Sequence, residues 1–186
     1  MLFRSEEEKK KGLIASSAGN HAQGVAFAAQ KLGVKATIVM PKHTPLIKVE
    51  ATARFGAEVV LHGEVYDEAY EKAKELQEEK GYIFVHPFDD DAVIAGQGTI
   101  ALEILKELPD VDIIMVPLGG GGLISGIAAA AKLKNPEIKI IGVEPEGAAS
   151  AIKSLNEGKV TELSESYTIA DGAAVKRIGD TTFEYI

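Results

Sequence analysis

The chain has 186 residues, 46% of them hydrophobic, with a formal net charge of −8 and an isoelectric point near 5.1. This length and apolar content suit one sizeable domain or two small ones, and the acidic balance argues against a non-specific nucleic-acid binder. The absence of cysteine excludes disulfides and thiolate metal sites, and four scattered histidines predict no metal site.

No apolar run approaches the length of a membrane span, and the start of the chain carries charge where a signal peptide would need an apolar stretch. We therefore expect a cytoplasmic protein with no membrane partner, whose ligands are small molecules.

The hydrophobic pattern predicts strands alternating with helices along the chain. The expected strands cover residues 12–16, 36–40, 57–62, 82–86, 111–117 and 138–144. The expected helices cover residues 21–33, the stretch from Thr44-Pro45 to Gly56, residues 66–80 and 93–108, and an Ala-rich segment after the glycines at 119–122. Periodicity weakens after residue 158, which predicts a loop or an incomplete element there.

This alternation is typical of an α/β fold with parallel strands covered by helices on both faces. We expect two lobes, a small one at 1–108 and part of a large one at 109–186, because the residues after 108 form a plausible joint. The alternative is a single flavodoxin-like sheet.

The stretch "SSAGNHAQG" at 16–24 joins a predicted strand directly to a helix. Its small residues let a ligand approach the backbone, and the first N–H groups of the helix point at whatever arrives. We interpret this loop as a ligand-binding loop.

A second loop, "VPLGGGGLISG" at 116–126, also follows a strand and opens a helix. Four consecutive glycines let backbone N–H groups converge on an anion, where the helix dipole favours negative charge. The loop predicts a phosphate site, although it matches neither G-x-G-x-x-G nor a P-loop.

These stretches, with "AGQGTIALEIL" and "TIADGAAVKR" in the expected order, resemble the fold type II pyridoxal-phosphate enzymes, and among them the threonine dehydratases (threonine ammonia-lyases). The resemblance implies pyridoxal 5'-phosphate as cofactor, its phosphate held by the backbone N–H groups of Gly119, Gly120, Gly121, Gly122 and Leu123. It implies that Asn20 hydrogen-bonds the oxygen of the cofactor ring. The residues implied to bind the substrate carboxylate are Ser17, Ala18, Gly19 and His21.

The implied reaction is β-elimination, which converts L-threonine to 2-oxobutanoate and ammonia, or L-serine to pyruvate. Ala18 stands where the similar serine racemases carry a hydroxyl, and this difference favours a dehydratase over a racemase.

Two departures from the family bear on activity. Its Schiff-base lysine lies upstream of the Ser-Ala-Gly-Asn-His loop in an Arg-Gly-Ala context, and nothing like it occurs before residue 16. Lys9, Lys10 and Lys11 read as the solvated end of a charged helix. The family's late strand, whose Ser or Thr faces the pyridine nitrogen, is not found after "TTFEYI". We expect the central portion of a threonine dehydratase, with no catalytic residue of its own, little activity alone, and a tendency to form homo-oligomers through exposed sheet edges.

Two other interpretations stay open at this point. In one, Glu144 touches a ribose and the chain is a Rossmann-like nucleotide-binding module. In the other, the chain is a folded fragment without a ligand.

Several further residues carry smaller expectations. Glu144 and Asp171 are candidates for a cation site or the border of the cofactor. We expect no chemistry from His43, His62 and His86, a helix N-cap within Asp89–Asp91, and close helix packing at Gly96–Gly98.

Overall fold

The computed structural model describes residues 5–186. The expectation of no signal peptide rests on residues 1–12, and residues 1–4 of that stretch lie outside the described residues. The chain divides into two compact units, Met1–Pro87 and Phe88–Ile186, which we call the N-terminal and C-terminal units.

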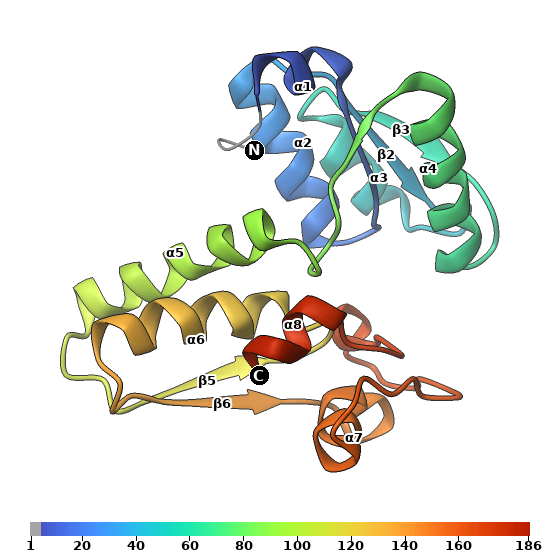
Figure 1. Cartoon of the computed structure of the whole chain (residues 1–186). Helices are drawn as coiled ribbons and strands as arrows, with labels where there is room; N and C mark the ends of the chain where they lie inside the picture. The colour runs from blue at the N-terminus through green and yellow to red at the C-terminus, as the bar shows by residue number, and fades with distance from the viewer. Residues whose placement is uncertain (1–4) are drawn as a thin grey trace. The chain divides into compact units, whose positions relative to one another are not determined.

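The N-terminal unit is a three-layer α/β structure (Figure 1). Its elements are α1 (Glu6–Lys11), β1 (Leu13–Ser16), α2 (Asn20–Leu32), β2 (Ala36–Met40), α3 (Leu46–Ala53), β3 (Glu58–Leu61), α4 (Tyr66–Lys80) and β4 (Ile83–Phe84). All four strands are parallel, in the order β3-β2-β1-β4.

Successive side chains of the central strands point to opposite faces of the sheet, so these strands contribute to a hydrophobic core on each face. On β1, Leu13 and Ala15 pack with the apolar stripe of α2, whereas Ile14 packs with Ala69 and Ala73 of α4. Every residue of β1 and β2 is buried, as expected for central parallel strands covered on both faces.

The first helix is short and polar, and its own residues explain why it forms. Ser5 and Glu8 form a capping box, in which the Ser5 hydroxyl accepts from the Glu8 amide and the Glu8 carboxylate accepts from the Ser5 amide. No residue of α1 is buried, which confirms the expectation of a charged, solvated helix that includes Lys9, Lys10 and Lys11.

The C-terminal unit is built around a βαβ motif (Figure 1). Its elements are α5 (Asp91–Glu107), β5 (Ile113–Pro117), α6 (Gly122–Lys134), β6 (Lys139–Val143), a 3₁₀ turn η1 (Glu146–Ala148), α7 (Ser150–Glu157), a second turn η2 (Asp171–Ala173) and α8 (Asp180–Tyr185). Strands β5 and β6 pair in parallel.

Helix α6 lies along one face of this two-stranded sheet, and α5 packs against α6. The crossing is close because both helices carry a glycine there: a Cβ on Gly126 would lie 2.2 Å from the Ile94 carbonyl oxygen, and one on Gly98 would lie 3.1 Å from the Gly126 carbonyl oxygen. This confirms close packing at Gly98, whereas Gly96 has no atom within 4 Å of a Cβ position.

The α/β class and all six strands are confirmed, with ends that differ by one or two residues from the expected ones in most cases. The strands form two separate sheets, as two lobes require, and not the single flavodoxin-like sheet of the alternative. Two details differ from the expected ones. The units divide after Pro87 and not after residue 108, because α5 packs on α6. A helix, α8, follows the weakly periodic stretch.

No helix within residues 5–186 is both long and apolar enough to cross a bilayer.

Candidate functional site

The strand order of the N-terminal unit identifies where a ligand would bind. The chain runs outward from β1 to β2 and β3, then returns to place β4 on the other side of β1. In open parallel sheets, ligands bind at the carboxyl ends of the strands where the order reverses. The two segments that leave the sheet at this point are Ser17–Gly19 after β1 and Val85–Pro87 after β4, so the predicted loop lies at the switch point of its sheet.

The loop after β1 presents backbone amides at the start of α2. The Gly19 amide donates to the Ser17 hydroxyl at 3.2 Å, and the first bond of the helix runs from the Gln23 amide to the Gly19 carbonyl at 3.4 Å. The amides of Asn20, His21 and Ala22 therefore precede the helical ladder and have no intrahelical acceptor. Asn20 is exposed, so its side chain is accessible to a ligand.

The side chain of His21 links the segment after β1 to the segment after β4 through a hydrogen bond. Its Nε2 lies 3.0 Å from the Val85 carbonyl oxygen. Burial lowers the pKa of His21, outweighing the opposing effect of this hydrogen bond. Because a carbonyl only accepts, the neutral ring carries its proton on Nε2 and leaves Nδ1 as an acceptor. A substrate carboxylate would therefore meet the backbone N–H of His21 as a donor, and not a cationic ring.

The loop between β5 and α6 holds five successive amides without acceptors. Helix α6 begins at Gly122, and its first helical bond runs from the Ser125 amide to the Gly121 carbonyl at 3.0 Å. Within the part of the chain that the structure describes, the amides from Gly119 to Leu123 donate to no backbone or side-chain atom. Gly120, Gly121 and Gly122 are buried, and Gly119 and Leu123 are partly buried. Because buried amides are almost always paired in native proteins, these amides favour an acceptor from outside the chain.

The tetraglycine loop also fits against neighbours that exclude side chains. A Cβ on Gly120 would lie 2.2 Å from the Phe88 ring, and one on Gly122 would lie 2.8 Å from the Phe88 Cα. Gly121 caps α6 with φ +97°, a left-handed conformation that favours glycine. The residues present therefore fit a phosphate group, which would accept from amides alone.

Charge placement favours an anion at these two helix starts. The first turns of α2 and α6 contain no acidic residue. The first turns of α3 and α7 also lack acidic residues, whereas those of α1, α4, α5 and α8 contain them. At the starts of α2 and α6, therefore, no carboxylate of the helix's own first turn opposes a bound anion.

Two of the three consecutive aspartates accept hydrogen bonds at the starts of two different helices. Asp90 is the N-cap of α5, where its side chain accepts from the Ala92 and Val93 amides at 2.8 and 3.3 Å, which confirms the expected N-cap. Asp89 instead accepts from the amides of Asp180 and Thr182 in α8, both at 3.1 Å. Local sequence signals did not reveal this second contact, because its partners lie about ninety residues away.

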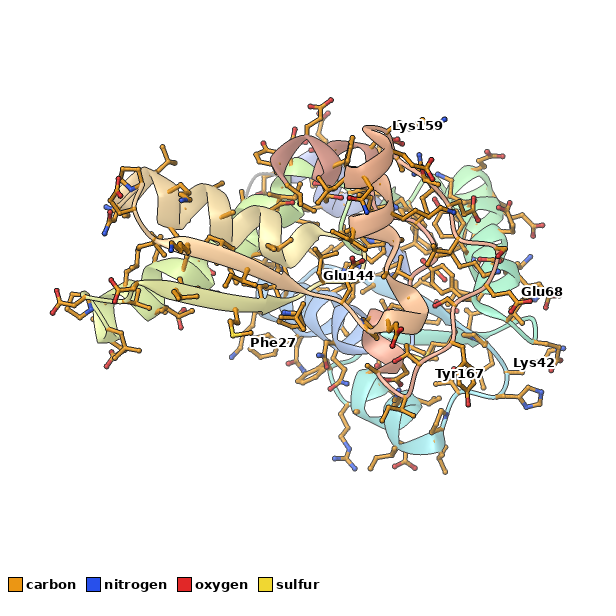
Figure 2. The ribbon with its side chains drawn as sticks, turned by 90° about the horizontal axis from the view of Figure 1, so that it is seen from below. Phe27, Lys42, Glu68, Glu144, Lys159 and Tyr167 are labelled. Atoms are coloured by element: carbon orange, nitrogen blue, oxygen red, sulfur yellow. The ribbon has the colours of Figure 1, made fainter. Side chains whose placement is uncertain are left out.

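The carboxylate of Glu144, labelled in Figure 2, is hydrogen-bonded within the C-terminal unit. Its two carboxylate oxygens accept from the amides of Ala151 and Ile152 at 2.8 and 2.9 Å, at the start of α7. These contacts leave it poorly placed for the ribose of the nucleotide-binding alternative. Asp171 lies in η2, and residues 5–186 contain no group of three or more His, Asp or Glu side chains that could hold a metal ion.

The remaining histidines lie at strand ends or in loops of the N-terminal unit. His43 pairs with the exposed Glu64 carboxylate, the His62 amide donates to the Met40 carbonyl at 2.8 Å, and the His86 ring lies 6.4 Å from the Phe84 ring.

Comparison with known proteins identifies a family model that the whole chain matches. All 186 residues match the family model described as "Pyridoxal-phosphate dependent enzyme". The chain is 57% identical over 182 residues to an L-threonine ammonia-lyase of Thermotoga maritima, covering 98% of this chain and 45% of that protein. It spans about half the length of the curated relatives it matches.

Solved structures show the same likeness. The processed form of threonine deaminase isoform 2 from Solanum lycopersicum superposes with a TM-score of 0.96 at 51% identity, covering 100% of this chain and 54% of that one. Maize serine racemase gives a TM-score of 0.93 at 40% identity, covering 98% and 55% of the two chains.

Proposed function

Because the chain belongs to the family of pyridoxal-phosphate dependent enzymes, we propose that it supplies the cofactor-phosphate loop and the substrate-carboxylate loop of an L-threonine ammonia-lyase. The observation that carries this proposal is the row of amides from Gly119 to Leu123 that have no acceptor within the described chain.

In this proposal the tetraglycine loop binds the phosphate of pyridoxal 5'-phosphate. The N–H groups of Gly119, Gly120, Gly121, Gly122 and Leu123 donate to the phosphate oxygens at the positive end of α6. No side chain takes part, so this contact needs no titrating group of the protein.

The Ser17–His21 loop binds the amino-acid end of the substrate. The backbone N–H groups at the start of α2 hold the carboxylate, and the Ser17 hydroxyl keeps the loop in shape by accepting from the Gly19 amide. The exposed Asn20 side chain donates to the oxygen of the cofactor ring. His21 fixes the loop through Val85 while its ring stays neutral.

When bound, the cofactor supplies an electron sink for the bond that breaks at the amino-acid Cα. The residues of this chain then orient L-threonine so that its β-hydroxyl can leave, giving 2-oxobutanoate and ammonia. Ala18 carries no hydroxyl with which to handle a proton beside the substrate, which supports elimination over racemisation.

A titration of the 186-residue chain with pyridoxal phosphate, followed by absorbance, tests the phosphate loop. Pyridoxal without the phosphate is the matched ligand. We expect saturable binding of pyridoxal phosphate, at least about tenfold tighter than pyridoxal, since each hydrogen bond to a charged group contributes about 1.5–3 kcal/mol.

Equal affinity for the two ligands would contradict the assignment of the phosphate to the tetraglycine loop. Borohydride reduction of the loaded chain checks the expectation that no lysine of residues 1–186 forms the covalent link. A stoichiometric reduced adduct on any one lysine of residues 1–186, Lys9, Lys10 and Lys11 included, would overturn that expectation.

A further inference from the structure

We infer that Thr182 and Asp89 are positioning residues that set the direction of the Gly121 amide, and with it the anion affinity of the tetraglycine loop. This inference rests on the proposed function. It concerns a segment some sixty residues beyond the loop, whose connection to the loop no sequence motif indicated.

The contact itself is made at one carbonyl. The Gly120 carbonyl oxygen accepts from the Thr182 hydroxyl at 2.8 Å and from the Gly179 amide at 3.2 Å. Thr182 is fully buried, so water does not compete for this bond. The hydroxyl has one proton, and its other acceptor within reach, the Gly179 carbonyl oxygen, lies farther away at 3.2 Å. The Gly120 carbonyl is therefore held by two donors from one distant segment.

Fixing this carbonyl fixes the next amide. The peptide bond between Gly120 and Gly121 is planar and trans, so its C=O and N–H point in opposite directions. With the carbonyl directed at Thr182, the Gly121 N–H must point away from α8. Without the two hydrogen bonds to the Gly120 carbonyl, the peptide group between Gly120 and Gly121 could rotate at small cost, because both residues are glycines. The bonds at Gly120 thus preorganise a donor of the loop.

Asp89 holds Thr182 in place. Its two carboxylate oxygens accept from the amides of Thr182 and Asp180, and so cap the first turn of α8. The approach is close: a Cβ on Gly179 would lie 2.2 Å from an Asp89 carboxylate oxygen. The Ser125 hydroxyl of α6 donates to the Thr182 carbonyl at 3.4 Å, which joins α8 to the helix that the loop opens.

The test compares Thr182→Val, which keeps the shape but removes the donor, with Thr182→Ser, which keeps the hydroxyl. We expect Thr182→Val to weaken pyridoxal phosphate binding about tenfold and pyridoxal binding less than about twofold. Thr182→Ser should restore the affinity to within about twofold of wild type. Asp89→Asn should act like Thr182→Val, because its amide group can replace only one of the two acceptors.

The matched control is Ser154→Ala. The Ser154 hydroxyl is also buried in the C-terminal unit, where it donates to the Ser150 carbonyl and accepts from the Thr161 amide. We expect this variant to lose stability with unchanged phosphate affinity. If Ser154→Ala weakens binding as much as Thr182→Val, the effect is general destabilisation and the inference fails.

The unliganded chain gives a second readout by ¹H–¹⁵N correlation spectroscopy. We expect Thr182→Val to shift the Gly121 amide resonance, Thr182→Ser to leave it near its wild-type position, and Ser154→Ala not to move it. An unchanged Gly121 resonance in Thr182→Val overturns the inference. If wild type binds neither inorganic phosphate nor pyridoxal phosphate, the proposed function fails, and this resonance still decides whether Thr182 sets the amide.

Discussion

The imidazole of His21 donates from Nε2 to the carbonyl oxygen of Val85 across 3.0 Å, and this bond joins the start of α2 to the segment that leaves β4. The two segments flank the switch point of the N-terminal sheet. The bond therefore holds the Ser17–His21 loop at the position where a ligand of this unit would bind.

The stability of the chain should depend on the protonation of His21. Burial lowers the pKa of His21 below 6.5 in the folded chain, so the unfolded chain binds more protons near that pH. The stabilising contribution is present above about pH 6.5 and is lost as the pH falls through the folded pKa. Urea unfolding of wild type and His21→Gln at pH 8 and pH 5.5 measures this. We expect the difference in free energy of unfolding between wild type and His21→Gln to be smaller at pH 5.5 than at pH 8. A difference that does not change with pH would contradict a stabilising role of neutral His21.

The crossing of α5 and α6 should not tolerate a methyl group at Gly126. A Cβ there would lie 2.2 Å from the Ile94 carbonyl oxygen and 2.6 Å from the Gly98 nitrogen, both backbone atoms that cannot turn aside. We expect Gly126→Ala to lower the free energy of unfolding by about 1–3 kcal/mol. Gly96→Ala is the control, because it lies in α5 with open space, and should raise stability by up to about 1 kcal/mol. Similar effects of the two changes would refute the close crossing.

Gly120 and Phe88 should behave as a coupled pair. A Cβ on Gly120 would meet the Phe88 ring at 2.2 Å, so we expect Gly120→Ala to destabilise by about 1–3 kcal/mol and to impair pyridoxal phosphate binding. Phe88→Ala removes the obstructing ring. Urea unfolding of both single variants and the double variant should show that Gly120→Ala costs much less when Phe88 is Ala. Additive effects would mean that the loop does not pack on Phe88.

Removal of the Glu144 carboxylate should affect stability and not ligand binding. Glu144 accepts from the first amides of α7, so we expect Glu144→Ala to cost about 1 kcal/mol, a typical value for a lost helix cap. Chemical denaturation measures this cost, and a titration with pyridoxal phosphate should give the wild-type affinity. Saturable NAD binding that Glu144→Ala abolishes would instead favour the nucleotide-binding alternative.

Local sequence signals predicted most of the fold. Each buried parallel strand is a short apolar run, and α4 shows its apolar stripe at helical spacing, so 36–40 and 66–80 match β2 and α4 residue for residue. The sequence also predicts the position of the two glycine-containing loops, each of which joins a strand to a helix through small residues; that they bind ligands stays a prediction.

The contacts that the sequence did not predict are those between distant segments. Helix α8 has six residues, too few for a periodic pattern, and its cap is Asp89, 91 residues away from Asp180. A Pro-Asp pair after α5 predicts the boundary between the units there, but α5 packs on α6 at the two glycines and belongs to the C-terminal unit. Such pairings depend on three-dimensional packing, which no local pattern encodes.

The binding of the cofactor phosphate by the tetraglycine loop is tested most directly by mapping pyridoxal phosphate on the unmodified chain by ¹H–¹⁵N correlation spectroscopy. We expect saturable shifts of the amides from Gly119 to Leu123, reproduced in this loop by inorganic phosphate, and shifts of the Ser17–His21 amides on addition of the whole cofactor with L-threonine. Shifts that avoid the tetraglycine loop, or no shifts at millimolar ligand, would contradict the claim that this loop holds the cofactor phosphate.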